Sequence, residues 1–146
     1  MGTAQASDAV ENAFIDHVFR TYTWPKPPAL YVALFTAAPS DAGGGTEVSS
    51  GSYARVNLPP SDSNWTATQG GTSGLSIGTG GMTSNAVAIT FPAPTADWGT
   101  VGWFAIFTAA SGGTMYVWDA LVAPRTILNG DPAPSFQPGS LQITLQ

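Results

Sequence analysis

The sequence contains no cysteine and one histidine, His17. Without cysteine the chain has neither a disulfide framework nor a thiolate nucleophile. One imidazole and no thiolate cannot supply the ligand set of a typical zinc site. The sequence also has no Asp-x-Asp-x-Asp-Gly loop suited to calcium. We therefore expect no metal site and no cofactor. The lack of cysteine also fits synthesis in a reducing cytoplasm.

Charged residues are equally scarce: they make up 9% of the chain, against about 25% of an ordinary soluble domain. Four basic and nine acidic residues give a net charge of −5. We expect no nucleic-acid or anionic-membrane partner, because both need clustered Lys and Arg. No apolar stretch approaches the ~20 residues that span a bilayer, and the N-terminus lacks the pattern of a secretory signal. So little charge predicts a surface that is either rich in Ser, Thr and Gly or largely covered by partner proteins.

The residues that could do acid–base or nucleophilic chemistry do not form a recognisable active site. A Ser–His–Asp arrangement would have to use His17, which follows Asp16 in a predicted helix, and the sequence has no Gly-x-Ser-x-Gly elbow. A pair of carboxylates could still act as general acid and base. The candidates, however, lie at predicted turns or strand ends, where Asp usually forms a cap or a turn. They are Glu47, Asp62, Asp97 and Asp119. We expect no catalytic residues and no enzymatic activity.

One amphipathic helix is predicted near the N-terminus, from Asp8 to about Thr21. The pattern Asp8-x-x-Glu11 resembles a capping box in which the Asp8 carboxylate caps the first turn. Apolar residues then recur at helical spacing. They are Val10, Phe14, Val18 and Tyr22, with Ile15 and Phe19 beside them.

This apolar stripe has two interpretations. In the commoner use of such a stripe, it faces the domain's own core and closes the end of the β-domain. In the other, it docks onto a partner, and the candidate interface is then Phe14, Val18, Tyr22 and Trp24. The stiff connector Trp24-Pro25-Lys26-Pro27-Pro28 follows. We therefore divide the chain into an N-terminal segment, residues 1–28, with a loose arm over 1–7, and a β-domain, residues 29–146.

The β-domain centres on a predicted hairpin of residues 101–107 and 114–121, joined by Ser111-Gly112-Gly113. Alternation puts Val101, Trp103, Ala105 and Phe107 on one face of the first strand. Further strands are predicted at 29–36, 53–58, 65–68, 85–91, 125–129 and 140–146, with a glycine-dense, almost chargeless segment at 70–81. Short strands with regular turns predict an all-β, antiparallel β-sandwich. A jelly roll is the first choice, and an immunoglobulin-like sandwich, which usually carries a Cys pair, is the second.

Aromatic residues suggest a separate class of function. Exposed aromatic rings on a β-sandwich can stack against sugar rings, so Trp24, Trp65 and Trp98 raise the hypothesis of a carbohydrate-binding module. Tryptophan is used more often in cores and interfaces. A sugar site would need aromatic rings in one plane with Asp, Asn or Arg beside them.

Four segments, taken in order, resemble a family of small bacteriophage virion proteins. They are YVALFT (31–36), TEVSSGSYAR (46–55), FPAPTADWGTV (91–101) and ILNGD (127–131). Proteins of this kind are often labelled phage tail fibre proteins, and similar ones serve as capsid cement (decoration) proteins. The resemblance implies a virion protein made in the bacterial host cytoplasm, and it brings no catalytic residues to carry over.

Between these two functions, the residues favour cement. The chain is one compact domain without the repeats of a long fibre, and its low charge predicts extensive interfaces. On this interpretation the protein lies on the capsid exterior, binds the major capsid protein and forms a homotrimer, as similar proteins do at three-fold positions of the shell. The alternative is a tail fibre or a host-receptor (carbohydrate) binding protein.

Overall fold

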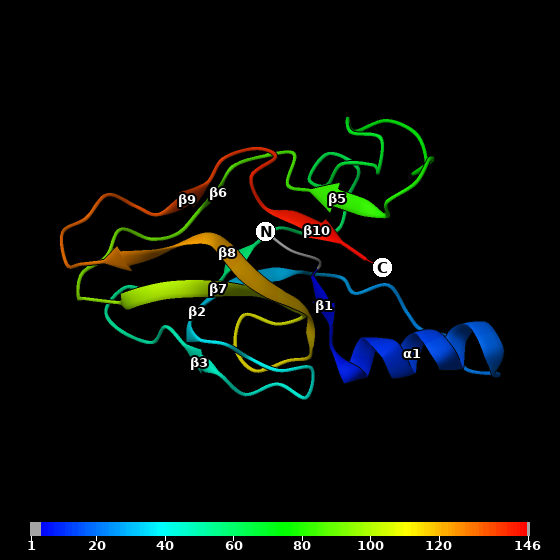
Figure 1. The fold of residues 1–146 in the computed structure, drawn as a ribbon, viewed down its shortest axis with the longest axis horizontal. Helices are drawn as coiled ribbons and strands as arrows, with labels where there is room; N and C mark the ends of the chain where they lie inside the picture. Colours follow the sequence, from blue (N-terminus) through cyan, green and yellow to red (C-terminus); the bar gives the residue numbers. More distant parts are fainter. Residues whose placement is uncertain (1–3, 146) are drawn as a thin grey trace.

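The computed structural model describes residues 4–145 and is built mainly of antiparallel strands (Figure 1). One sheet of six strands has the order β1-β8-β7-β2-β3, with β4 also paired to β2. Two further pairs, β5–β10 and β6–β9, are separate. The elements are β1 (Gln5–Ala6), α1 (Asp8–Phe19), β2 (Tyr31–Ala37), β3 (Thr46–Glu47), β4 (Val56–Asn57), β5 (Met82–Ser84), β6 (Ile89–Thr90), β7 (Gly99–Phe107), β8 (Met115–Ile127), β9 (Ser135–Phe136) and β10 (Gln142–Thr144).

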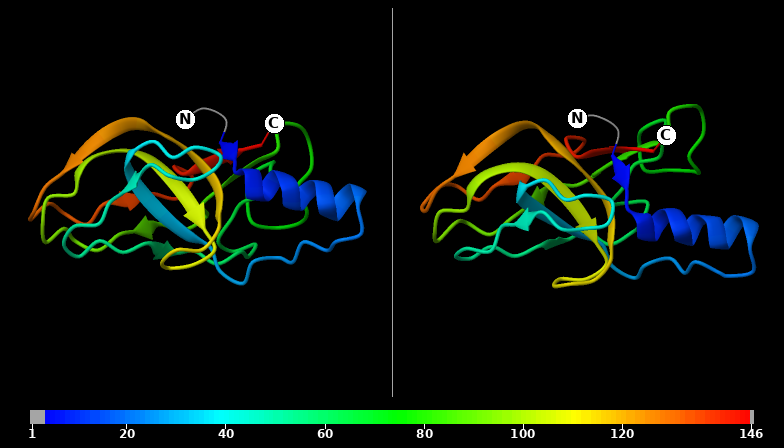
Figure 2. Two further views of the ribbon diagram at one scale, coloured as in Figure 1. Left: turned by 90° about the horizontal axis from the view of Figure 1, so that it is seen from below. Right: turned by 60° about the horizontal axis from the view of Figure 1, so that its bottom comes forward.

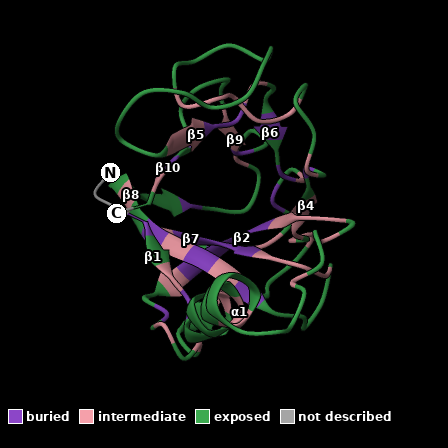
Figure 3. Ribbon diagram, turned by 90° about the vertical axis from the view of Figure 1, so that its right-hand side faces the viewer, coloured by how far each residue is buried: buried purple, intermediate pink, exposed green. Residues whose placement is uncertain are grey.

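The strands form two layers. Seen from the side, β5, β6 and β9 lie above the main sheet that contains β2 and β7 (Figure 3). The predicted all-β, sandwich-like fold with one N-terminal helix is therefore confirmed. The finer prediction of a jelly roll is not confirmed by a strand order that puts six strands in one sheet and four in two separate pairs.

The main core lies between these layers. Phe104 and Ile106 of β7 and Val32 of β2 are buried there, together with Ile89 and Leu141 from the second layer. Both faces of the sheet are covered, because a second cluster forms on its outer side from Ala33, Phe35, Ala105 and Met115. The nearly continuous apolar run of β2 is explained by this double coverage.

The predicted β7–β8 hairpin is confirmed, but one of its faces was assigned wrongly. The pairing of β7 with β8 shifts register between Val101 and Trp103. Val101 therefore joins the main core, whereas Trp103 and Phe107 pack on the outer cluster. At this irregularity four residues of β8 lie opposite Gly102 alone, and the alternation of β7 changes phase there.

Strand β8 is longer than predicted, because Pro124 does not end it. Ala120 pairs with Trp103 and Arg125 with Val101, so residues 121–124 lie opposite Gly102 in the irregular stretch. Proline lacks an N–H and is tolerated in a sheet at such bulges. The separately predicted strand at 125–129 is therefore the end of β8.

In the second layer, the predicted strand at 85–91 is shortened to Ile89–Thr90 by the buried side chain of Asn85. Its Nδ2 donates to the carbonyls of Val87 (2.8 Å) and Gln137 (2.9 Å), and its Oδ1 accepts from the amide of Leu141 at 2.9 Å. These bonds tie the β5–β10 pair to the β6–β9 pair. The predicted strand at 65–68 is reduced to a single bridge between Trp65 and Asn85.

The described part of the N-terminal arm is not loose. Gln5 and Ala6 pair with Trp118 and Val117, which makes β1 an edge strand of the main sheet. Residues 1–3 of the predicted arm lie outside the described residues. The proposed boundary between residues 1–28 and 29–146 stays a prediction. Within residues 4–145, no helix has the length and apolar character needed to cross a membrane.

The N-cap of the helix lies one residue before the predicted one. Ser7, not Asp8, is the N-cap, and its Oγ accepts from the amide of Val10 at 3.3 Å. The same hydroxyl donates to the carbonyl of Met115 at 2.5 Å, so the cap is also a buried link to β8. Asp8 lies in the first turn, where its carboxylate interacts favourably with the positive end of the helix dipole and stabilises the helix.

Candidate functional site

Helix α1 extends away from the two layers (Figure 1), and two further views show the same projection (Figure 2). None of its residues, all of which the structure describes, is buried. Phe14 and Val18 are each 51% exposed and Phe19 is 73% exposed. We define Phe14, Ile15, Val18 and Phe19 as the α1 apolar face, because residues three and four apart are neighbours on a helix surface.

The chain itself uses the other side of the helix. His17 Nδ1 accepts from the backbone amide of Trp24 at 3.0 Å, so the connector folds back along the helix at this point. The neighbouring Asp16 forms an exposed ion pair with Arg20 at 3.0 Å. The interpretation that the stripe closes the β-domain is therefore wrong for Phe14 and Val18. The interpretation that it docks onto a partner stays a prediction.

The four predicted interface residues differ in their surroundings. Tyr22 is 63% exposed, like Phe14 and Val18. Trp24 is partly buried: its ring lies 5.6 Å from the Tyr116 ring, centroid to centroid, and its Nε1 donates to Tyr116 Oη at 3.2 Å. Trp24 thus attaches the connector to β8, and Phe14, Val18 and Tyr22 are available for contact.

Strong contacts fix the helix to the sheet at its start. Ser7 donates its backbone amide to the carbonyl of Tyr116 at 3.0 Å, and the Asp8 amide donates to the carbonyl of Asp41 at 3.0 Å. Together with the Ser7 hydroxyl and β1, these bonds hold the first turn. A helix held at its base can present an apolar face without losing its orientation, which reduces the entropy cost of docking.

A partly buried ion pair, which the sequence did not reveal, lies on the outer side of the sheet. Arg55 donates from Nε and Nη2 to the two carboxylate oxygens of Glu47, each at 2.8 Å. Its Nη1 donates to the carbonyls of Ala109 and Gly112, both at 2.8 Å, and its guanidinium lies 3.7 Å from the centre of the Phe107 ring. The pair joins β3 to the β7–β8 turn and so has a structural role.

Tyr53 belongs to the same cluster. Its hydroxyl donates to Glu47 Oε1 at 2.9 Å and accepts from the amide of Leu34 at 3.0 Å. Burial, and to a smaller extent the Glu47 carboxylate, raise the pKa of Tyr53 well above its usual value. Glu47, one of the carboxylates considered for catalysis, is thus occupied by two partners of the chain itself.

Asp97 and Asp119, two further candidate carboxylates, each accept a hydrogen bond from a backbone amide. Asp97 accepts from the amide of Asn129 at 2.8 Å, as expected for a turn residue. Asp119 is buried on β8; its Oδ1 accepts from the amide of Ala120 at 2.8 Å, and within the described part of the chain Oδ2 has no partner. Residues 4–145 contain no group of three or more His, Cys, Asp or Glu placed to hold a metal ion.

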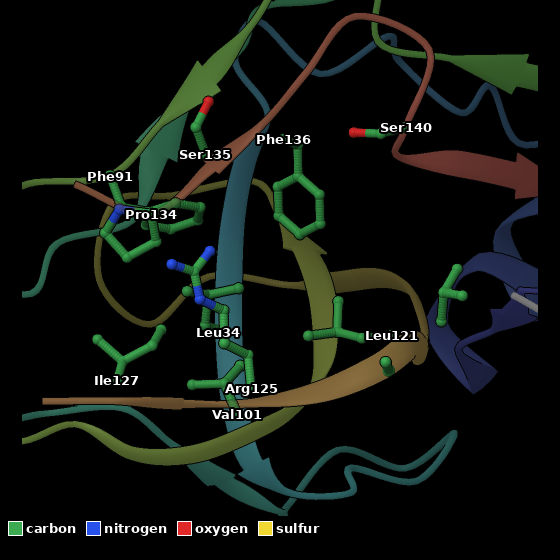
Figure 4. A pocket seen from close by; sticks show the side chains of 12 residues that line it. Leu34, Phe91, Val101, Leu121, Arg125, Ile127, Pro134, Ser135, Phe136 and Ser140 are labelled. Atoms are coloured by element: carbon green, nitrogen blue, oxygen red, sulfur yellow. The ribbon is translucent and has the colours of Figure 1, made fainter. Parts of the chain in front are cut away.

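Two cavities open between the layers. The smaller, about 230 Å³, is mostly apolar and is lined mainly by Leu34, Phe91, Val101, Leu121, Ile127 and Phe136. The Arg125 side chain rises into it from β8 toward Pro134 (Figure 4). The larger, about 500 Å³, includes Trp65 and Tyr116 in its lining. Of the three tryptophans considered for sugar stacking, Trp98 is buried and Trp65 faces this larger cavity.

A family model described as "Podophage GP4 fiber I protein gp80" matches residues 5–144, nearly the whole chain. No curated protein matches the sequence. The matched residues include both β1 and α1 as well as the two layers. The chain therefore belongs to the podophage GP4 fiber I protein gp80 family and is a structural protein of a phage virion.

Proposed function

We propose that this protein is a tail-fibre subunit that attaches to another virion protein through the α1 apolar face. The observation that carries the proposal is the exposure of Phe14, Val18 and Phe19 on a helix that the chain anchors but does not cover. The family description, which names a fiber protein, supports a place in the tail.

The energy of such a contact follows from the exposed area. Burying the exposed half of each large apolar side chain stabilises a complex by roughly 1 kcal/mol. The α1 apolar face and Tyr22 thus provide several kcal/mol before the entropy cost of association. Stable interfaces bury about 1,200–2,000 Å² in total, so the partner must also reach the surface beside the helix.

The proposal is tested by incorporation into particles. The double substitution Phe14→Ser/Val18→Ser removes the centre of the α1 apolar face, and Val122→Ser/Leu128→Ser is a matched control with two exposed apolar residues of β8 and its end. Particles assembled with each variant are purified and the bound protein is quantified. We expect the Phe14→Ser/Val18→Ser variant to be missing from the particles and the Val122→Ser/Leu128→Ser variant to be incorporated normally. Equal incorporation of both would overturn the proposal.

A capsid cement protein is the second candidate, favoured by the charge fraction of 9% and the single compact unit. In that function the same face would meet the major capsid protein on the capsid exterior. Imaging of labelled particles separates the two candidates. Density over the capsid, with particles that break at lower temperature when the protein is missing, supports cement. Density at the tail, with stable particles that fail to adsorb to cells, supports the fibre.

Two further parts of the proposal concern assembly and chemistry. We expect a homotrimer, which sedimentation of the isolated protein at micromolar concentration would reveal. A monomer in this experiment would mean that trimers form only on the particle.

We also expect no enzymatic role for Asp97 or Asp119. Loss of a hydrolytic activity in Asp97→Ala or Asp119→Ala, with the fold intact, would contradict this.

A further inference from the structure

The larger cavity carries a second inference, which does not depend on how the protein attaches to the virion. Its volume, about 500 Å³, lies within the range of about 300–1,000 Å³ that is usual for small-molecule sites. Its apolar lining includes Ile106 of β7, Val117 of β8 and Ile143 of β10. The cavity therefore opens where the two layers separate, away from the α1 apolar face.

Two aromatic side chains line the cavity in fixed positions. Trp65 Nε1 donates to the carbonyl of Leu58 at 3.3 Å, and Tyr116 Oη accepts from Trp24 Nε1 at 3.2 Å. Both rings remain partly exposed, so part of their surface is available to a ligand. Rings held by hydrogen bonds lose little freedom when a ligand stacks on them.

Two charged side chains also line the cavity. Asp62 and Lys26 both belong to its lining. Neither side chain forms a hydrogen bond or an ion pair with any residue in the range 4–145. The carboxylate is thus free to accept, and the ammonium to donate, hydrogen bonds from a ligand. A purely apolar ligand would remove water from these charges without replacing its hydrogen bonds, which is unfavourable.

We infer that this cavity binds a neutral saccharide, with one sugar ring stacked against Trp65 or Tyr116 and its hydroxyl groups on Asp62 and Lys26. A pyranose ring combines an apolar face of C–H groups with hydroxyl groups at its edge, which matches aromatic rings beside free polar groups. The Asp62 carboxylate and the net charge of −5 disfavour a strongly anionic ligand.

The glycine-rich loop completes the rim. Leu75 lines the cavity although its side chain is mostly exposed, and Gly74 before it has a φ of +77°, which glycine adopts readily. The loop is held by Gln69, whose Nε2 donates to the carbonyl of Leu75 at 3.0 Å. In the complex, Leu75 covers the apolar side of the sugar ring.

The experiment titrates the full chain with methyl glycosides of a hexose, a 6-deoxyhexose and an N-acetylhexosamine, and follows the indole Nε1–H signal of Trp65 by NMR. We expect at least one glycoside to shift this signal in a saturable way. Asp62 is exposed, so Asp62→Ala should leave the fold intact. It should weaken binding about tenfold, because a hydrogen bond to a charged group is lost. Trp65→Ala removes the observed signal, so its binding is measured by calorimetry and should be abolished; if this variant does not fold, Asp62→Ala alone decides.

The glycine-rich loop offers a matched control. Leu75→Ser should weaken binding, whereas Ile77→Ser should not, because Ile77 is exposed on the same loop but does not line the cavity. The inference is overturned if no glycoside shifts the Trp65 signal, or if Ile77→Ser weakens binding as much as Leu75→Ser. It is also overturned if an apolar dye binds in the cavity and no sugar competes with it.

Discussion

The β7–β8 hairpin and helix α1 contain the same kinds of apolar side chain in opposite surroundings. Phe104 of β7 is 0% exposed, whereas Phe14 of α1 is 51% exposed. Apolar residues recur at every second position in the strands and at every third or fourth position in the helix, so both segments have an apolar stripe. The chain covers both faces of the hairpin, whereas no residue of the helix is buried and its apolar face is left exposed. The comparison separates the residues that stabilise the fold from those left for another molecule.

The largest expected difference is between truncations in the two regions. Phe104→Ala should lower the free energy of unfolding by about 3–5 kcal/mol, because it leaves a cavity in the main core. Phe14→Ala should change it by less than about 0.5 kcal/mol, as usual for surface substitutions. Urea denaturation of the isolated protein measures both. A large loss of stability in Phe14→Ala would mean that the helix face is covered after all.

The ion pairs of the two regions provide the next test. Arg55→Ala should cost about 2–4 kcal/mol, somewhat less than a fully buried pair because Glu47 is partly exposed. The exposed pair on α1 is the control, and Arg20→Ala should cost less than about 1 kcal/mol. The same denaturation series compares them, and equal losses would show that the Glu47–Arg55 pair does not hold the β7–β8 turn.

The smallest expected difference concerns two tyrosines. Tyr53→Phe removes the hydrogen bond to Glu47 and should cost about 1–2 kcal/mol near neutral pH, whereas Tyr22→Phe on the exposed connector should cost nothing measurable. Burial raises the pKa of Tyr53, so the folded protein holds this proton more tightly than the unfolded chain. The stability that Tyr53 contributes is therefore complete below about pH 10 and is lost as the pH rises above it.

The Tyr53→Phe variant should consequently lose less stability than the natural protein when the pH is raised above that value. Thermal unfolding at several alkaline pH values makes the comparison, with Tyr22→Phe as the control. Identical pH profiles for Tyr53→Phe and the natural protein would contradict the burial of the Tyr53 hydroxyl.

Periodicity in the sequence predicted the helix, the central hairpin and the sandwich-like layers, because each depends on local patterns. It did not predict the bulge at Gly102, the passage of β8 through Pro124 or the interruption at Asn85. Those features depend on contacts between residues far apart in the chain. The pairing of Gln5 and Ala6 with β8 was missed for the same reason, since two residues carry no usable pattern.

The candidate site was predicted only in part. The stripe of Phe14, Val18 and Tyr22 could be read from helical spacing, but spacing does not tell which way a stripe faces. The role of His17 and Trp24 in folding the connector against the other side of the helix required coordinates. The cavity at Trp65 is lined by segments far apart in the chain and left no local signal beyond the aromatic residues themselves.

The absence of cysteine allows the central claim to be tested directly on particles. Val18→Cys places one thiol on the α1 apolar face, and Val122→Cys places one on exposed β8 as a control. Labelling with a maleimide is timed in the isolated protein and in intact virions. We predict that both variants react in isolation and that only Val18→Cys is protected in the virion. Equal labelling of Val18→Cys in both states would contradict attachment through α1.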